Sequence, residues 1–131
     1  MRNLISTQWH ALLDYLLAIM LLIGPWFFNF PDDQTGKTMC LASVGMILLF
    51  NLLTKHELGI IRVIPMPLHL NLDLVMGIFL ILSVFLFDMQ YGAYMLLVLS
   101  GAIILGSSLY TKPYMKKHTP PVKIKYDTER D

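Results

Sequence analysis

Four long apolar stretches constrain this chain more than any other feature of its sequence. They cover about residues 8–28, 38–54, 68–87 and 93–110 of a chain in which 56% of the 131 residues are hydrophobic. A helix of about 20 residues crosses a hydrocarbon core about 30 Å thick, and each stretch approaches that length. Backbone polar groups in lipid are satisfied only in helices or closed barrels, and unbroken apolar runs exclude a barrel. The chain is therefore predicted to be an all-α membrane protein with four transmembrane helices.

The positions of lysine and arginine predict how these helices are oriented. Arg2 precedes the first stretch, Lys55 and Arg62 lie between the second and the third, and six basic residues follow the fourth. Basic residues mark cytoplasmic segments. We therefore expect a multi-pass protein of the inner (cytoplasmic) membrane with both termini cytoplasmic. Residues 1–111 would form the transmembrane domain, and residues 112–131 a polar cytoplasmic tail.

An internal repeat relates the two halves of the apolar region. A shift of 59 residues places the pair His10 and Asp14 on the pair His69 and Asp73. Leucine matches are common in so apolar a chain, but two His-x-x-x-Asp pairs at the same depth are not. The sequence therefore predicts two units, at about residues 8–54 and 68–110.

The second half of each unit aligns under a slightly different shift. After a three-residue adjustment in the outer loop, a shift of 56 residues places Gly45 on Gly101 and Ile47 on Ile103. Each unit contains two helices, so both units cross the membrane in the same direction. The units are predicted to be parallel two-helix repeats related by a pseudo-two-fold axis along the membrane normal.

These features make the chain resemble the SPW repeat membrane proteins, which are built from tandem two-helix units. The family is named for a Ser-Pro-Trp motif at the end of the first helix of each unit. Here the first unit has Gly24-Pro25-Trp26, and the second unit keeps only the serine, Ser83. The resemblance extends over nearly all of residues 8–110. It implies the tandem two-helix fold and no particular biochemical activity.

The two His-x-x-x-Asp pairs are the main candidate site. Residues four apart share one face of a helix, so His10 lies beside Asp14, and His69 beside Asp73. Ionisable side chains at membrane depth are costly and usually face protein or a water-filled cavity. We expect the four groups to meet in the cytoplasmic half of the bilayer.

Three interpretations of this polar cluster remain open. The leading one is a hydrogen-bonded network that fixes the register of the helices. The second is a path for protons or ions, since histidine changes its charge near neutral pH. The third is a metal site, because two imidazoles and two carboxylates suit Zn, Fe or Mn. Haem held by two histidines is disfavoured because the helices are expected to pack too closely to admit it.

Other residues are assigned to packing. Ala18 and Gly77 lie one turn beyond the aspartates and are predicted to let the first and third helices approach closely. Pro25 and Trp26 are predicted to end the first helix and to anchor it at the membrane interface. The single cysteine, Cys40, is predicted to be a small buried hydrophobic residue.

Several further polar residues lie near the ends of the apolar stretches. Asn51, Ser107 and Ser108 lie at the depth of the His-Asp pairs and are candidate partners for them, although serines in such helices usually bond their own backbone. His56 and His118 lie in polar segments and are predicted to be solvated.

The function predicted from these observations is that of a small integral membrane protein of unknown activity. We expect a non-enzymatic structural, accessory or self-associating subunit, because the chain has no catalytic motif and little sequence outside the membrane. The alternative is a proton- or ion-translocating or metal-binding protein that uses the His-Asp pairs. No cofactor is predicted apart from that metal ion. The expected partners are the bilayer and further copies of the chain or other membrane subunits, not nucleic acid, since the net charge is only +1.

Overall fold

Four helices make up most of the chain in a computed structural model that describes residues 4–113. They are α1 (Thr7–Phe27), α2 (Gln34–Leu53), α3 (Met66–Leu86) and α4 (Tyr91–Tyr110). Each helix is long and apolar enough to cross a membrane, which confirms the predicted all-α membrane fold. The predicted tail beyond Pro113, including His118, lies outside the described residues.

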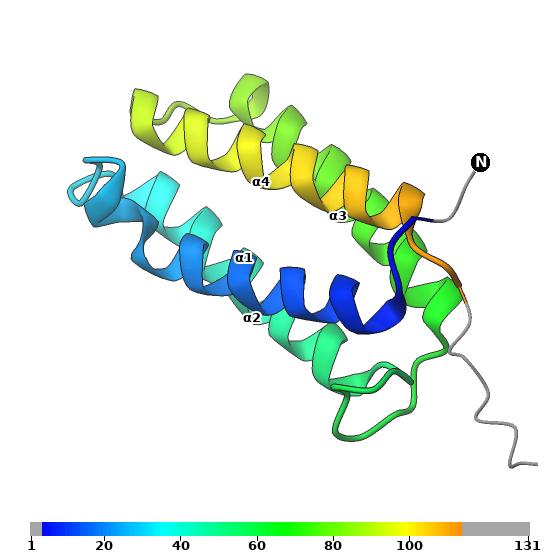
Figure 1. The fold of residues 1–131 in the computed structure, drawn as a ribbon. Helices are drawn as coiled ribbons and strands as arrows, with labels where there is room; N and C mark the ends of the chain where they lie inside the picture. Colours follow the sequence, from blue (N-terminus) through cyan, green and yellow to red (C-terminus); the bar gives the residue numbers. More distant parts are fainter. Residues whose placement is uncertain (1–3, 114–131) are drawn as a thin grey trace, which may run out of the picture.

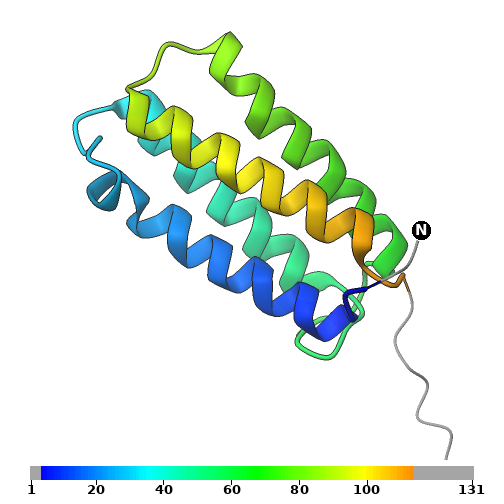
Figure 2. The same ribbon diagram turned by 45° about the horizontal axis from the view of Figure 1, so that its top comes forward.

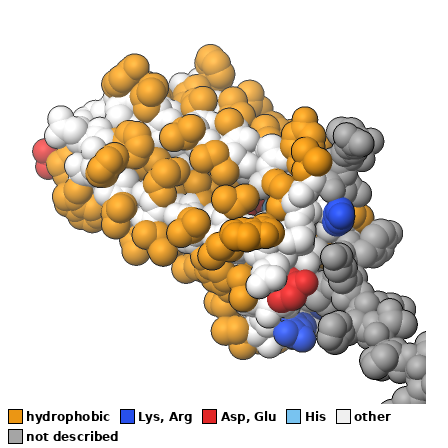
Figure 3. All heavy atoms as spheres, viewed as in Figure 1, with side chains coloured by type: hydrophobic (Ala, Val, Ile, Leu, Met, Phe, Trp, Pro, Cys, Tyr) orange, Lys and Arg blue, Asp and Glu red, His pale blue; other side chains and the backbone are white. Residues whose placement is uncertain are grey.

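The helices form two hairpins that lie side by side (Figures 1 and 2). The α1–α2 and α3–α4 turns lie at one end of the bundle. The α2–α3 loop and both ends of the described chain lie at the other end. Hydrophobic side chains cover most of the lateral face shown in Figure 3, and the charged side chains are confined to the two ends. This distribution suits a bundle whose sides face lipid and whose ends face water.

Local sequence explains where the helices begin and end. The Ser6 side chain accepts a hydrogen bond from the Trp9 N–H at the start of α1. Asp33 caps α2 through Oδ1, which accepts from the Gly36 N–H, and its Oδ2 accepts from the Gln90 N–H at the start of α4. One carboxylate thus holds the N-terminal ends of both helices together.

The C-terminal end of α1 extends slightly beyond the predicted stop. Pro25 lies inside the last turn, and the helix continues to Phe27 before Asn29 adopts a left-handed φ of 57°. Pro25 is buried, whereas the Trp26 side chain is 69% exposed at the end of the helix. That exposure suits the predicted role of Trp26 as an interfacial anchor, which stays a prediction.

Helices α3 and α4 of the second hairpin pack closely against each other. A Cβ atom on Gly77 would lie 2.8 Å from Leu105 Cγ and 3.0 Å from the carbonyl oxygen of Gly101, both in α4. Gly77 therefore allows close approach of α3 to α4. The expectation that Gly77 would face Ala18 of α1 is wrong, because a glycine in α3 lies against the partner helix of its own hairpin. Ala18 is buried in the core.

The helix boundaries also correct the repeat register. A shift of 59 residues converts the bounds of α1 into those of α3, as expected, but a shift of 57 residues converts those of α2 into those of α4. Under the shift of 57, all the buried residues of α2 fall on buried residues of α4. The shift of 56 instead places the exposed Gly45 on the buried Gly101. The adjustment between the α1–α2 and α3–α4 loops is therefore two residues rather than three, while the two-fold axis itself stays a prediction.

Packing between the hairpins is unequal. Helix α1 packs along α4, whereas α2 and α3 make almost no backbone approach to each other. The core between the hairpins is filled mainly from α1 and α4, with Leu17, Leu21, Leu96 and Leu97 all buried. The side of the bundle between α2 and α3 is left less tightly closed.

We expect Gly101→Ala to destabilise the protein. Its new Cβ would lie 2.7 Å from the Gly77 carbonyl oxygen and 2.8 Å from Ile81 Cγ1, so α3 and α4 must separate. Overpacking of this kind typically costs about 1–3 kcal/mol. Gly45→Ala is the matched control, since nothing lies within 4 Å of its added Cβ and alanine favours the helix. Equal melting temperatures of the two variants in detergent would contradict the close approach.

Candidate functional site

The structure brings the four residues of the polar cluster together at one end of the bundle. His10 Nε2 lies 2.9 Å from Asp73 Oδ2, and His69 Nε2 lies 3.2 Å from Asp14 Oδ2. The same atoms also approach within each helix, at 3.5 Å for His10 and Asp14 and 3.3 Å for His69 and Asp73. The four atoms form a closed ring of alternating nitrogen and oxygen. All four residues are buried.

The outer nitrogen of each histidine is held by a threonine. His10 Nδ1 lies 2.9 Å from Thr111 Oγ1, and His69 Nδ1 lies 3.0 Å from Thr54 Oγ1. Each threonine hydroxyl donates its only proton to the carbonyl four residues earlier in its own helix. Each Oγ1 must therefore accept from the histidine, which assigns a proton to Nδ1 in both rings.

This assignment determines what faces the centre of the cluster. With Nδ1 protonated, a neutral imidazole presents the lone pair of Nε2. The Nε2 atoms of His10 and His69 and the Oδ2 atoms of Asp14 and Asp73 then offer four lone pairs and no donor. Buried acceptors without a donor are costly. The ring therefore needs either two additional protons or a cation among these four atoms.

The sequence did contain a signal for the two threonines. Thr54-Lys55 and Thr111-Lys112 are related by the shift of 57 residues, which the shift of 56 concealed. The backbone around them repeats as well, because Lys55 N–H donates to Ile64 and Lys112 N–H donates to Ile5. Each threonine thus lies just after the C-terminal end of its helix. There the next residue hydrogen-bonds to the backbone of a segment that leads into another helix.

Two further polar residues tie the helices together just beyond the histidines. The Asn51 amide donates to the carbonyl oxygen of Ala11 at 3.0 Å, and the Ser108 hydroxyl donates to that of Leu70 at 3.1 Å. Ala11 and Leu70 directly follow the two histidines. Ser107 bonds within its own helix, to Ile104. Asn51 and Ser108 therefore support the backbone that carries the cluster rather than its side chains.

The prediction that His56 is solvated is wrong. Its side chain is fully buried, with Nε2 2.7 Å from Asn51 Oδ1 and Nδ1 accepting from the Leu58 N–H. The ring centroid lies 6.2 Å from that of His69. Burial lowers the pKa of His56 below its ordinary value of 6.5. His56 is thus a neutral support beside the cluster.

The fold and this site define a class of protein: a four-helix membrane protein with a buried His₂Asp₂ cluster shared between two hairpins. Residues 8–111 match the SPW repeat domain, and the chain belongs to that family. The match confirms the resemblance inferred from the sequence. The chain has no significant match among curated proteins or solved structures.

The threonine contacts can be tested with Thr111→Val, which keeps the shape of the side chain and removes the acceptor of His10 Nδ1. Leaving a buried donor unsatisfied costs about 1–3 kcal/mol, so the melting temperature should fall. Thr38→Val is the control, because its hydroxyl makes the same bond to its own helix but is exposed. A loss no greater than that of Thr38→Val would contradict the proposed tautomer.

The buried His56 predicts a specific pH dependence. Since its folded pKa lies below the unfolded value, its contribution to stability is complete above about pH 6.5 and is lost as the pH falls through the folded pKa. His56→Gln can still donate to Asn51 and cannot titrate. We expect its stability deficit relative to the wild type to shrink between pH 8 and pH 5 in detergent melting experiments. A deficit that grows on acidification would show that the sign is wrong.

Proposed function

We propose that the chain binds a divalent transition-metal ion at His10, Asp14, His69 and Asp73. The observation that carries this proposal is the convergence of two imidazole and two carboxylate lone pairs, with both Nδ1 protons already bound by threonines. Metal-ligating histidines characteristically donate their other ring N–H to such an outer partner. The cluster has the composition and the supporting hydrogen bonds of a metal site.

The spacing of the four atoms supports their binding to one shared ion, since all four lie within 4.8 Å of one another. Adjacent atoms in the ring are 2.9 to 3.5 Å apart. Ligands bonded at about 2.0–2.2 Å in a tetrahedron lie about 3.3–3.6 Å from one another. The four His–Asp distances therefore lie within a few tenths of an ångström of the spacing that such ligands adopt around one ion.

Charge balance favours a divalent ion. Asp14 and Asp73 carry two negative charges when ionised, and the histidines would bind as neutral ligands. A divalent ion makes the sum zero, which matters because net charge in the membrane interior is costly. Mixed imidazole and carboxylate ligands suit Zn²⁺, Fe²⁺ or Mn²⁺, and a set of four protein ligands favours Zn²⁺ among them.

A site with four protein ligands and no open position is typical of structural metal ions. The ligands come from α1 and α3, which belong to different hairpins and pack mainly against α2 and α4. The ion would therefore join the two hairpins. The proposed role is that of a non-enzymatic structural or accessory subunit whose fold is held together by the ion.

A second candidate function is proton binding. The contacts of 2.9 and 3.2 Å between Nε2 and Oδ2 have hydrogen-bond lengths, so two protons could occupy the ring instead of a metal. The protein would then be a proton-linked membrane protein. Chelation and pH distinguish the candidates, because only the metal site loses stability with EDTA at constant pH.

The setting proposed for this function is the inner membrane, with both termini cytoplasmic. The α2–α3 loop, which carries Lys55 and Arg62, and the segment after α4, which carries Lys112, lie at the same end of the bundle as the cluster, which supports that orientation by the positive-inside rule. Association with further copies or with other membrane subunits fits a small protein that has little surface outside the bilayer. The His₂Asp₂ site would then lie in the cytoplasmic half.

Metal analysis of the purified full chain tests the proposal. We expect one divalent ion per chain, lost in His10→Ala/His69→Ala and retained in His56→Gln, a matched change of a buried histidine that is not a ligand. Thr111→Val should weaken the affinity about 10–100-fold through the outer contact. EDTA should lower the melting temperature of the wild type, and added Zn²⁺ should restore it. Metal-free protein with no response to EDTA or Zn²⁺ would refute the metal site.

A further inference from the structure

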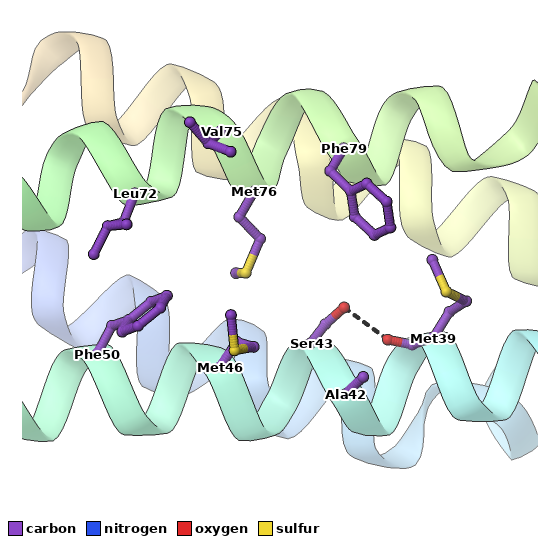
Figure 4. A pocket seen from close by; sticks show the side chains of 9 residues that line it. All are labelled: Met39, Ala42, Ser43, Met46, Phe50, Leu72, Val75, Met76 and Phe79. Carbon is purple, nitrogen blue, oxygen red and sulfur yellow. Dashed lines mark hydrogen bonds between the residues drawn. The ribbon is translucent and has the colours of Figure 1, made fainter. Parts of the chain in front are cut away.

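An apolar groove lies between α2 and α3, on the side of the bundle where the hairpins are least closely packed. Its cavity volume is about 240 Å³, and Figure 4 shows side chains of both helices pointing into it. Met46 and Met76 face each other across its middle, with Phe50 and Phe79 on either side. The Ser43 hydroxyl donates a hydrogen bond of 2.7 Å to the carbonyl oxygen of Met39 in its own helix. The side chains that line the groove therefore offer no free hydrogen-bond donor to an occupant.

The corresponding interface on the other side of the bundle is closed. Helix α4 packs against α1, where a Cβ on Gly24 would overlap Leu96 Cδ2. Leu17 and Leu96 are buried at that interface. The shifts of 59 and 57 residues place them on Met76 and Met39, which line the groove. Positions that are buried at the α1–α4 interface are thus only half-buried at its α2–α3 counterpart.

We infer that this groove binds a single acyl chain of a membrane phospholipid between α2 and α3. The inference goes beyond the proposed metal site and does not depend on it. An acyl chain in the groove would supply α2 and α3 with the kind of apolar contacts that α1 and α4 make directly with each other. Flexible methionines adapt their shape to an irregular hydrocarbon occupant.

Dimensions select this occupant over a protein segment. A cavity of about 150 Å³ accommodates benzene, so the larger groove accommodates a slender chain, whereas a helix with side chains is about 10–12 Å wide. The lining runs from Met39 to Phe50 along α2, which corresponds to about 17 Å at 1.5 Å per residue. An extended acyl chain lying along the membrane normal has that shape. A stable contact with a second copy would involve about 20–30 residues a side, far more than line the groove.

Ala42→Phe tests the inference, because it places a ring in the groove from an exposed position of α2. Leu41→Phe is the matched control, since Leu41 is 56% exposed on the same helix and does not line the groove. The full chain would be purified in detergent and examined by native mass spectrometry for retained phospholipid. We expect one phospholipid on the wild type and on Leu41→Phe, and loss of it from Ala42→Phe.

A thermal titration gives a second readout. Added dioleoylphosphatidylglycerol should raise the melting temperature of the wild type and of Leu41→Phe, because a ligand that binds the folded state stabilises it. It should not raise that of Ala42→Phe. Met76→Phe fills the groove from α3 and should behave like Ala42→Phe if the latter folds poorly. Equal lipid retention or equal temperature rise in the filled variants would overturn the inference, as would a wild-type dimer that Ala42→Phe dissociates.

Discussion

The ring formed by two histidines and two aspartates is the interaction on which the arrangement of the two hairpins depends. Four ionisable groups buried in an apolar bundle are tolerated only when each one has a partner. Here each Nε2 lies near the Oδ2 of both aspartates, and no group can leave the ring without exposing another to an apolar interior. The ring therefore fixes how far α1 and α3 can slide or rotate relative to each other.

Local sequence was sufficient to predict the fold and the membership of this ring. Apolar length and turn residues located four helices, and the spacing of His10 to Asp14 and of His69 to Asp73 placed each pair on one helical face. These inferences depend only on the period of a helix and on the cost of charge in lipid. Both operate within a few turns of chain, so one sequence is enough to apply them.

The errors arose where contacts join distant parts of the chain. Thr111 supports His10 from 101 residues away, and no local pattern announces that pairing. His56 is buried because the loop after α2 folds back, with Ile60 and Ile61 donating to the Leu52 carbonyl. The partner of Gly77 was misassigned because the helical period identifies a face but not the helix that meets it. An outer-loop length wrong by one residue also rotates the inferred face of a helix by about 100°.

The placement of the two threonines has a consequence for how such a site could arise. His10 of the first unit is held by Thr111 of the second, and His69 of the second unit is held by Thr54 of the first. The shortest His-Asp contact likewise joins His10 to an aspartate of the other unit. A single two-helix unit thus carries half of the ligands and the support for the other half. A chain with only one unit would assemble this centre only by pairing with a second copy of itself, so the tandem chain has the chemistry of a homodimer joined by a loop.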